Sequence, residues 1–152
     1  MSKIVLKIKK FIALPHREKI FFFEAILILG MMRIGILLFS FKFLSRKLHL
    51  VTTHTKPTKV TDFELEIAVA IGKSIEKSVQ HTPWESACLV KAFTAYKMLK
   101  RRGISGCFYI GVNKDKQKKG EIKSHAWTEC NQTILTGKSG HEAFMILSIY
   151  QW

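Results

Sequence analysis

The sequence predicts an α+β fold in which helices come first and antiparallel strands follow. Two observations predict it. Residues 15–103 contain segments with helical apolar spacing and helix-capping residues, whereas residues 107–150 contain short runs of β-branched and aromatic residues separated by polar turns. At 152 residues, the chain has the length of one ordinary domain. We therefore expect a single core with a helical appendage at its N-terminus.

Composition excludes several protein classes. Hydrophobic residues make up 47% and charged residues 24% of the chain, which excludes a disordered or low-complexity protein. The three cysteines, Cys88, Cys107 and Cys130, form no CxxC pair and no zinc-finger spacing, so we expect neither a disulfide framework nor a structural metal. The basic and apolar N-terminus lacks a small-residue cleavage site. We expect a cytoplasmic protein, with attachment to the inner face of the membrane as an alternative.

The formal net charge of +14 predicts an anionic partner. Residues 1–50 carry ten basic and two acidic side chains, residues 51–80 carry four of each, and residues 81–152 carry eleven and five. The loop over residues 113–123 is rich in Lys and poor in aromatic residues, which argues against base stacking and nucleic-acid binding. It is interpreted as a solvated turn or as a docking surface for an acidic leader peptide or its carrier.

The segment from Phe21 to Leu44 has the length of a membrane span, but Glu24, Arg33 and Lys42 interrupt it. The pattern suits two helices, one from Pro15 to Met32 and the other from Arg33 onward. Three interpretations stay open: a buried helical hairpin that covers the core, a pair of helices in the interface of an anionic membrane, and a true span.

Residues 49–62 are rich in Thr and lack apolar periodicity, which indicates a linker with a boundary near residues 50–60. This predicts a helical region with its linker over residues 1–55 and a catalytic domain over residues 56–152. Thr61 or Asp62 is expected to cap a helix over residues 62–79.

A second helix is predicted to begin at Thr82-Pro83-Trp84-Glu85, where Thr, Pro and Glu form a capping box, and to end at Gly103. Cys88 lies early in this helix on its apolar face, where the helix dipole favours a negative sulfur. A cysteine nucleophile needs this placement, although a buried cysteine also commonly fills space.

Four strands are predicted after this helix, over residues 107–112, 124–130, 132–136 and 144–150. Alternation along the second strand places His125, Trp127 and Glu129 on one face and Ser124, Ala126, Thr128 and Cys130 on the other. A cysteine at a helix start and a histidine on a strand meet where that helix packs across the sheet. Cys88 and His125 are therefore candidates for a nucleophile and general base, while Cys107 and Cys130 are expected to be buried strand residues.

These residues carry a resemblance to a known family. The stretch PWESACLVKAFTAYKMLKRRGISGCFYIGV, followed by SHAWTEC and ILTG, resembles the transglutaminase-like (papain-like) leader peptidases of lasso-peptide biosynthesis. The matching positions are Trp84, Cys88-Leu89, Arg101-Arg102-Gly103, Gly111-Val112 and His125-Ala126-Trp127-Thr128-Glu129. The segment ALPHREKIFFFEA also resembles the region that precedes the catalytic domain in these proteins.

The resemblance implies a papain-like core with a catalytic helix packed on an antiparallel sheet. It implies a cysteine peptidase that removes the leader from a lasso-peptide precursor, with Cys88 as nucleophile and His125 as general base. In this family a separate leader-binding protein delivers the precursor and a separate lasso cyclase acts on the product. No cofactor or metal is expected, and dependence on a nucleotide stays open.

One departure from the family pattern concerns the third catalytic residue. Family members often carry an Asp on the strand after the His, whereas this chain reads Thr133-Ile134-Leu135-Thr136-Gly137-Lys138. A hairpin turn at Asn131-Gln132 would place His125 opposite Lys138. We expect a Cys–His dyad in which the Thr136 hydroxyl or a backbone carbonyl orients His125, with Trp84 lining the pocket. The alternatives are a transglutaminase-type acyl transferase and an inactive membrane-associated scaffold.

Overall fold

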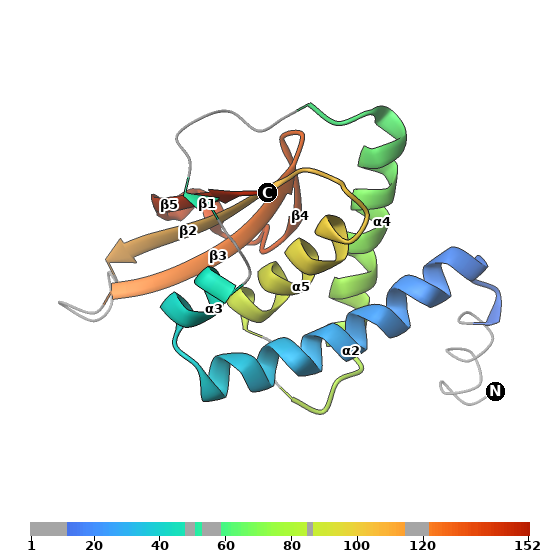
Figure 1. The fold of residues 1–152 in the computed structure, drawn as a ribbon, viewed down its shortest axis with the longest axis horizontal. Helices are drawn as coiled ribbons and strands as arrows, with labels where there is room; N and C mark the ends of the chain where they lie inside the picture. Colours follow the sequence, from blue (N-terminus) through green and yellow to red (C-terminus); the bar gives the residue numbers. More distant parts are fainter. Residues whose placement is uncertain (1–11, 48–50, 53–58, 85–86, 115–121) are drawn as a thin grey trace.

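The computed structural model describes residues 12–47, 51–52, 59–84, 87–114 and 122–152. Its described part has a layer of helices packed against an antiparallel sheet (Figure 1), which confirms the α+β prediction. The helices are α2 (His16–Leu38), α3 (Phe41–Lys47), α4 (Asp62–Val79) and α5 (Cys88–Lys100), and a 3-10 turn, η1, spans His141–Ala143. The strands are β1 (Val51–Thr52), β2 (Cys107–Lys114), β3 (Ile122–Cys130), β4 (Thr133–Thr136) and β5 (Met145–Gln151), in the order β1-β5-β2-β3-β4.

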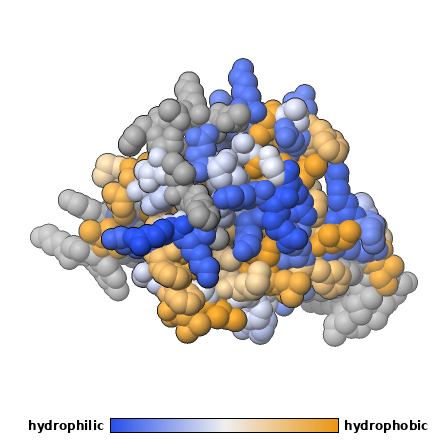
Figure 2. Space-filling view, in the orientation of Figure 1, coloured by the Kyte–Doolittle hydropathy of each residue, from blue (hydrophilic) through white to orange (hydrophobic). Residues whose placement is uncertain are grey.

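The N-terminal apolar segment forms one long helix, so the predicted break at Met32 and Arg33 is wrong. Helix α2 continues through Gly30 and Gly35, where side chains from other segments pack at ordinary van der Waals distance. The Trp84 ring lies 3.5 Å from a Cβ built at Gly30, and Leu44 of α3 lies 3.4 Å from one at Gly35. The outer side of α2 leaves hydrophobic surface along the lower edge of the molecule (Figure 2).

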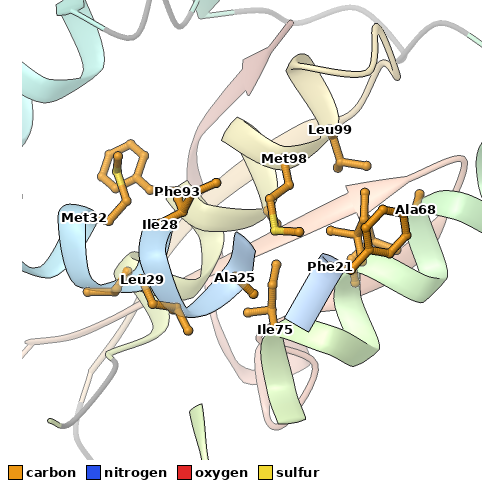
Figure 3. Packing of buried hydrophobic residues seen from close by; sticks show 14 of the residues in the cluster. Phe21, Ala25, Ile28, Leu29, Met32, Ala68, Ile75, Phe93, Met98 and Leu99 are labelled. Carbon is orange, nitrogen blue, oxygen red and sulfur yellow. The ribbon is translucent and has the colours of Figure 1, made fainter. Parts of the chain in front are cut away.

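The opposite side of α2 enters the main core. Figure 3 shows how its side chains meet those of α4 and α5. The buried residues of α2 recur every three or four positions: Phe21, Phe22, Ala25, Ile28, Leu29 and Met32. This spacing buries one helical face, and burial of such a face is the main source of stability for a helix in a folded domain. In the described part of the chain, α2 alone is long and apolar enough to cross a membrane.

The expected linker contains a short strand. Val51 and Thr52 pair with Gln151 and Tyr150 of β5, because β-branched residues suit an extended edge position. Most of the predicted boundary lies at residues 53–58, outside the described residues, so the two-domain division stays a prediction. Helix α4 begins as predicted, since Thr61 and Glu64 form a capping box.

Helix α5 begins at Cys88, later than the predicted start at Thr82-Pro83. The hydroxyl of Thr82 donates to the Val79 carbonyl of α4 at 3.0 Å, so it extends the end of α4 instead of capping α5. Glu85, the other half of the predicted capping box, lies outside the described residues. The predicted stop is confirmed: Gly103 adopts φ +67° directly after the helix.

The hairpin of β3 and β4 turns at Asn131 and Gln132, as predicted, with positive φ at both residues. Its register shifts by one residue, so that Glu129 pairs with Ile134 but Thr128 pairs with Thr136. The pairing ends there, and the predicted position of His125 opposite Lys138 is wrong. The bulge skips Leu135, whose carbonyl packs against Gly72 of α4.

Candidate active site

Cys88 is the first residue of α5, closer to the helix start than its sequence placement predicted. Ala87 provides no side-chain cap, and the first described amide to donate within the helix is that of Lys91, which donates to the Ala87 carbonyl. The preceding amides of a helix have no intrahelical acceptor. The half-buried Cys88 sulfur therefore lies at a helix start that no described side chain caps.

His125 lies on β3, on the strand face that alternation predicted. Its ring stacks with Trp127 at 5.9 Å between centroids and meets the Phe144 ring at 5.1 Å. Gly111 is the cross-strand partner of His125, and a Cβ there would collide with both Trp127 and Phe144. The glycine in the Gly-Val motif therefore makes room for the aromatic rings that hold the imidazole.

Among the described residues, the His125 ring has one hydrogen-bond partner, which defines its orientation. Its Nε2 lies 2.7 Å from the Gly137 carbonyl oxygen. A carbonyl only accepts, so Nε2 carries the proton and donates. In the neutral ring Nδ1 is then the acceptor, and a general base needs such an acceptor.

Cys88 and His125 line the same hollow, which has a volume of about 370 Å³. Aliphatic and aromatic residues form most of its remaining wall: Phe41, Leu89, Ile110, Ala126, Leu147 and Tyr150. A larger hollow of about 480 Å³ lies between α2 and α4, and none of the predicted site residues lines it. The structure thus brings the two predicted catalytic residues to one apolar recess at the junction of α5 and the sheet.

The two weaker site predictions, Thr136 and Trp84, do not line the hollow that Cys88 shares with His125, although Thr136 and His125 together line a neighbouring one. The Thr136 hydroxyl is buried, and it makes no hydrogen bond to the described residues, so it does not hold His125 in this structure. The carbonyl of the next residue, Gly137, occupies that role, which was the other alternative derived from the sequence. The Trp84 ring packs over Gly30 of α2 and is not among the residues that line the hollow.

Cys107 and Cys130 are both completely buried on strands, as predicted. Burial raises the pKa of the Cys107 thiol, and burial also raises the pKa of Cys130 to about 11. The Cys130 thiol donates to the Ser105 carbonyl at 3.3 Å. These two thiols therefore stay protonated at neutral pH and differ in environment from Cys88.

Two parts of the site had no clear sequence signal. Phe41 reaches the hollow from α3, where it also packs against Phe93 and Tyr150, with ring centroids 5.8 Å and 6.0 Å away. The Gly137 carbonyl is a backbone group, and every residue has one, so the residue type does not predict that it binds His125. The sequence signal for this turn was the glycine itself. Gly137 has a φ of +74°, which turns the chain back toward His125.

One of three comparisons with known proteins identifies a family for this chain. Residues 32–148 match the family model described as the transglutaminase-like superfamily, and this match spans more than half of the chain. No curated protein matches the chain, and no solved structure does. The match covers Cys88, His125 and the strands around them. The chain therefore belongs to the transglutaminase-like superfamily.

Proposed function

We propose that this protein is a cysteine peptidase that removes the leader peptide from a lasso-peptide precursor. One observation carries the proposal. Cys88 begins a helix that no described side chain caps, and it lines one hollow with His125, whose Nε2 donates to the Gly137 carbonyl. The resemblance of the motifs around both residues to lasso-peptide leader peptidases supports the substrate class. A separate leader-binding protein and a separate cyclase are the partners that this role requires.

In the proposed reaction, His125 Nδ1 accepts the thiol proton of Cys88, and the thiolate attacks the scissile carbonyl carbon. The tetrahedral intermediate collapses as the carbon–nitrogen bond breaks and His125 protonates the leaving amine. The leader then remains on Cys88 as a thioester. Water, deprotonated by His125, hydrolyses the thioester and restores the thiol. Throughout, the bond from Nε2 to the Gly137 carbonyl holds the ring in position.

The start of α5 offers the oxyanion donors that this chemistry needs. Because Ala87 supplies no side-chain cap, the first-turn amides beside Cys88 are candidates to donate to a developing negative oxygen. A helix N-terminus also favours that charge through its dipole. The same feature thus serves both the thiolate and the oxyanion.

The hollow favours an apolar side chain of the substrate near the cleaved bond. Leu89 and Ile110 line its wall together with Tyr150, and Leu147, which is 66% exposed, lies at the accessible part of the wall. A Leu147→Lys variant is expected to raise KM several-fold with a smaller effect on kcat, because the cation weakens binding of an apolar group. Equal losses in kcat and kcat/KM would instead place Leu147 in the transition-state machinery.

An acyl transferase is the second candidate function, because the same thioester can pass its acyl group to an amine. The transglutaminase-like superfamily match supports either chemistry. The two outcomes differ in their products: hydrolysis gives two peptides, whereas transfer gives a cross-linked one.

The proposal is tested with lasso precursors encoded beside this gene, together with the leader-binding partner. Mass spectrometry follows cleavage by the wild type and by Cys88→Ala and His125→Ala. A single leader cut that disappears in both variants would support the peptidase. A cut that persists in Cys88→Ala would exclude this cysteine as the nucleophile, and a cross-linked product would favour the transferase.

Matched controls are available in the same chain. Cys107→Ala removes a cysteine that does not line the hollow, and His141→Ala removes a histidine whose Nδ1 contacts the Lys138 carbonyl. Both control proteins are expected to cut the precursor. If either control loses cleavage although circular dichroism shows that it is folded, the losses in Cys88→Ala and His125→Ala could not be assigned to catalysis by these two residues.

A further inference from the structure

The outer face of α2 is apolar along most of its length. From Ile20 to Leu38, every exposed residue of this helix is apolar. Six of them recur at helical spacing and form what we call the outer stripe: Ile20, Phe23, Leu27, Met31, Ile34 and Leu38. The stripe runs about 27 Å at a rise of 1.5 Å per residue. A continuous apolar face of this length marks an interaction site.

We infer that the outer stripe docks the protein on the surface of an anionic lipid bilayer, with α2 lying in the plane of the interface. The helix cannot simply insert across the bilayer while the domain stays folded. Its other face, including Ala25 and Leu29, is buried against α4 and α5. Only the side of α2 that carries the stripe is exposed, which is the geometry of an interfacial helix.

Charge around the stripe favours anionic lipid over another protein surface. Helix α3 follows α2 directly, and its Lys42, Arg46 and Lys47 are all exposed. On the N-terminal side, the sequence MSKIVLKIKK carries four Lys and no acidic residue. Exposed cations therefore follow the C-terminal end of the apolar face, and each Lys or Arg near an anionic leaflet adds attraction.

The acidic residues of α2 do not oppose this attraction. Glu24 is engaged by two guanidinium groups, at 3.1 Å from Arg101 and 2.6 Å from Arg102, and its side chain is only 13% exposed. Glu18 lines the hollow between α2 and α4, on the side of the helix away from the stripe. The exposed charged residues of α2 and α3 are therefore all basic: Arg17, Lys42, Arg46 and Lys47.

The C-terminal end of the stripe has features that suit a lipid. Phe39 and Phe43 are both exposed, and their rings stack at 4.8 Å. A hollow of about 240 Å³ opens beside them, with Met31 and Gly35 in its wall. Lys47 and Lys97 also line this hollow. Apolar groups next to two ammonium groups match an acyl chain next to an anionic headgroup.

The test is flotation of the full chain with vesicles. One set is pure phosphatidylcholine, and the other contains phosphatidylglycerol as roughly one third of the lipid. The wild type is expected to float with the anionic vesicles and to dissociate as salt is raised. Equal binding to neutral vesicles would overturn the role of charge, and no binding to either set would overturn the proposal.

Paired variants assign the binding to the stripe. Leu27→Gln with Ile34→Gln removes two stripe residues that are 69% and 59% exposed. Ile122→Gln with Phe63→Gln removes two apolar residues of similar exposure, 69% and 65%, on other elements. The stripe variant should lower the partition coefficient by about tenfold or more, while the control variant stays near wild type. Equal values for the two would refute the assignment.

A protein partner would give a different pattern. If the stripe joined two copies of this chain, the wild type would sediment as a dimer that Leu27→Gln with Ile34→Gln converts to a monomer, with no flotation. Binding of the stripe to the leader-binding partner alone, again without flotation, would equally overturn the proposal. None of these measurements uses peptidase activity, so the result is independent of the proposed function.

Discussion

The Arg102 guanidinium holds the Glu24 carboxylate with two hydrogen bonds, at 2.6 Å and 3.2 Å, and so ties the end of α5 to α2. The same guanidinium lies 4.6 Å from the Phe21 ring centroid and donates to the Met98 carbonyl at 2.8 Å. The Arg-Arg-Gly motif therefore has a structural role in this chain. It joins the long N-terminal helix to the helix that begins with Cys88.

Glu24→Gln is expected to lower the free energy of unfolding by about 1.5–3 kcal/mol, because it leaves a partly buried guanidinium without its charged partner. Urea denaturation followed by circular dichroism measures the change. Glu66→Gln is the matched control, since Glu66 pairs with Arg17 at the surface with side chains 65% and 45% exposed. That control should cost less than about 1 kcal/mol. Similar costs for both would contradict the role assigned to Arg102.

Gly137→Ala is expected to reduce kcat by about tenfold or more. A Cβ at this residue would overlap the Ala126 carbonyl oxygen and lie 2.9 Å from Trp127 Cβ, so the segment must move and its carbonyl must leave His125. Precursor cleavage kinetics measure the loss. Gly140→Ala is the control: Gly140 has φ +73°, close to the +74° of Gly137, but open space around it. Equal losses in kcat would show that backbone strain alone is responsible.

Iodoacetamide at neutral pH is expected to modify Cys88 and to spare Cys107 and Cys130. Cys88 is half-buried at a helix start, whereas the other two thiols are buried and their pKa values are raised by burial. Peptide mass spectrometry should find one adduct per native chain, none in Cys88→Ala, and further adducts only after denaturation. An adduct on Cys130 in the native protein would contradict the packing described here.

Stability is expected to fall as the pH rises above about 9, because burial raises the pKa of Cys130 from 9.0 to about 11. A raised folded-state pKa means that this contribution is complete below the unfolded value and is lost as the pH rises through the folded one. Urea denaturation between pH 8 and pH 11 measures the slope. Cys130→Ser, which does not ionise in this range, should flatten it. Some slope should remain, because burial also raises the pKa values of Cys107 and Tyr109. An unchanged slope would rule out Cys130 as its source.

Local chemistry accounts for the features that sequence reasoning predicted correctly. The capping box at Thr61 and Glu64, the stop at Gly103 and the turn at Asn131-Gln132 each depend on a few neighbouring residues. Alternation along β3 also correctly predicted which residues share a face of the strand. His125 and Trp127 stack on one face, whereas Thr128 lies on the other and donates its hydroxyl to the Ala92 carbonyl of α5.

Features that depend on distant contacts were the ones that sequence reasoning missed. The predicted cap at Thr82 is an exception with a local cause, because its hydroxyl donates to the Val79 carbonyl three residues earlier, at the end of the preceding helix. The predicted break at Met32 and Arg33 is wrong because Leu29 and Met32 are buried in the core that α2 shares with α4 and α5. The bulge at Leu135 similarly depends on the close approach of Gly72 in α4.

The sequence by itself determined that helices precede the four C-terminal strands, and it identified the two residues, Cys88 and His125, that carry the proposed chemistry. Residue type and spacing suffice for this, because a thiol and an imidazole are chemically distinctive. Only the tertiary structure decided that the Gly137 carbonyl holds the imidazole and that one face of α2 stays outside the core. Both depend on which segments pack together in space, since every residue has a carbonyl and an apolar residue has the same character on either face of a helix.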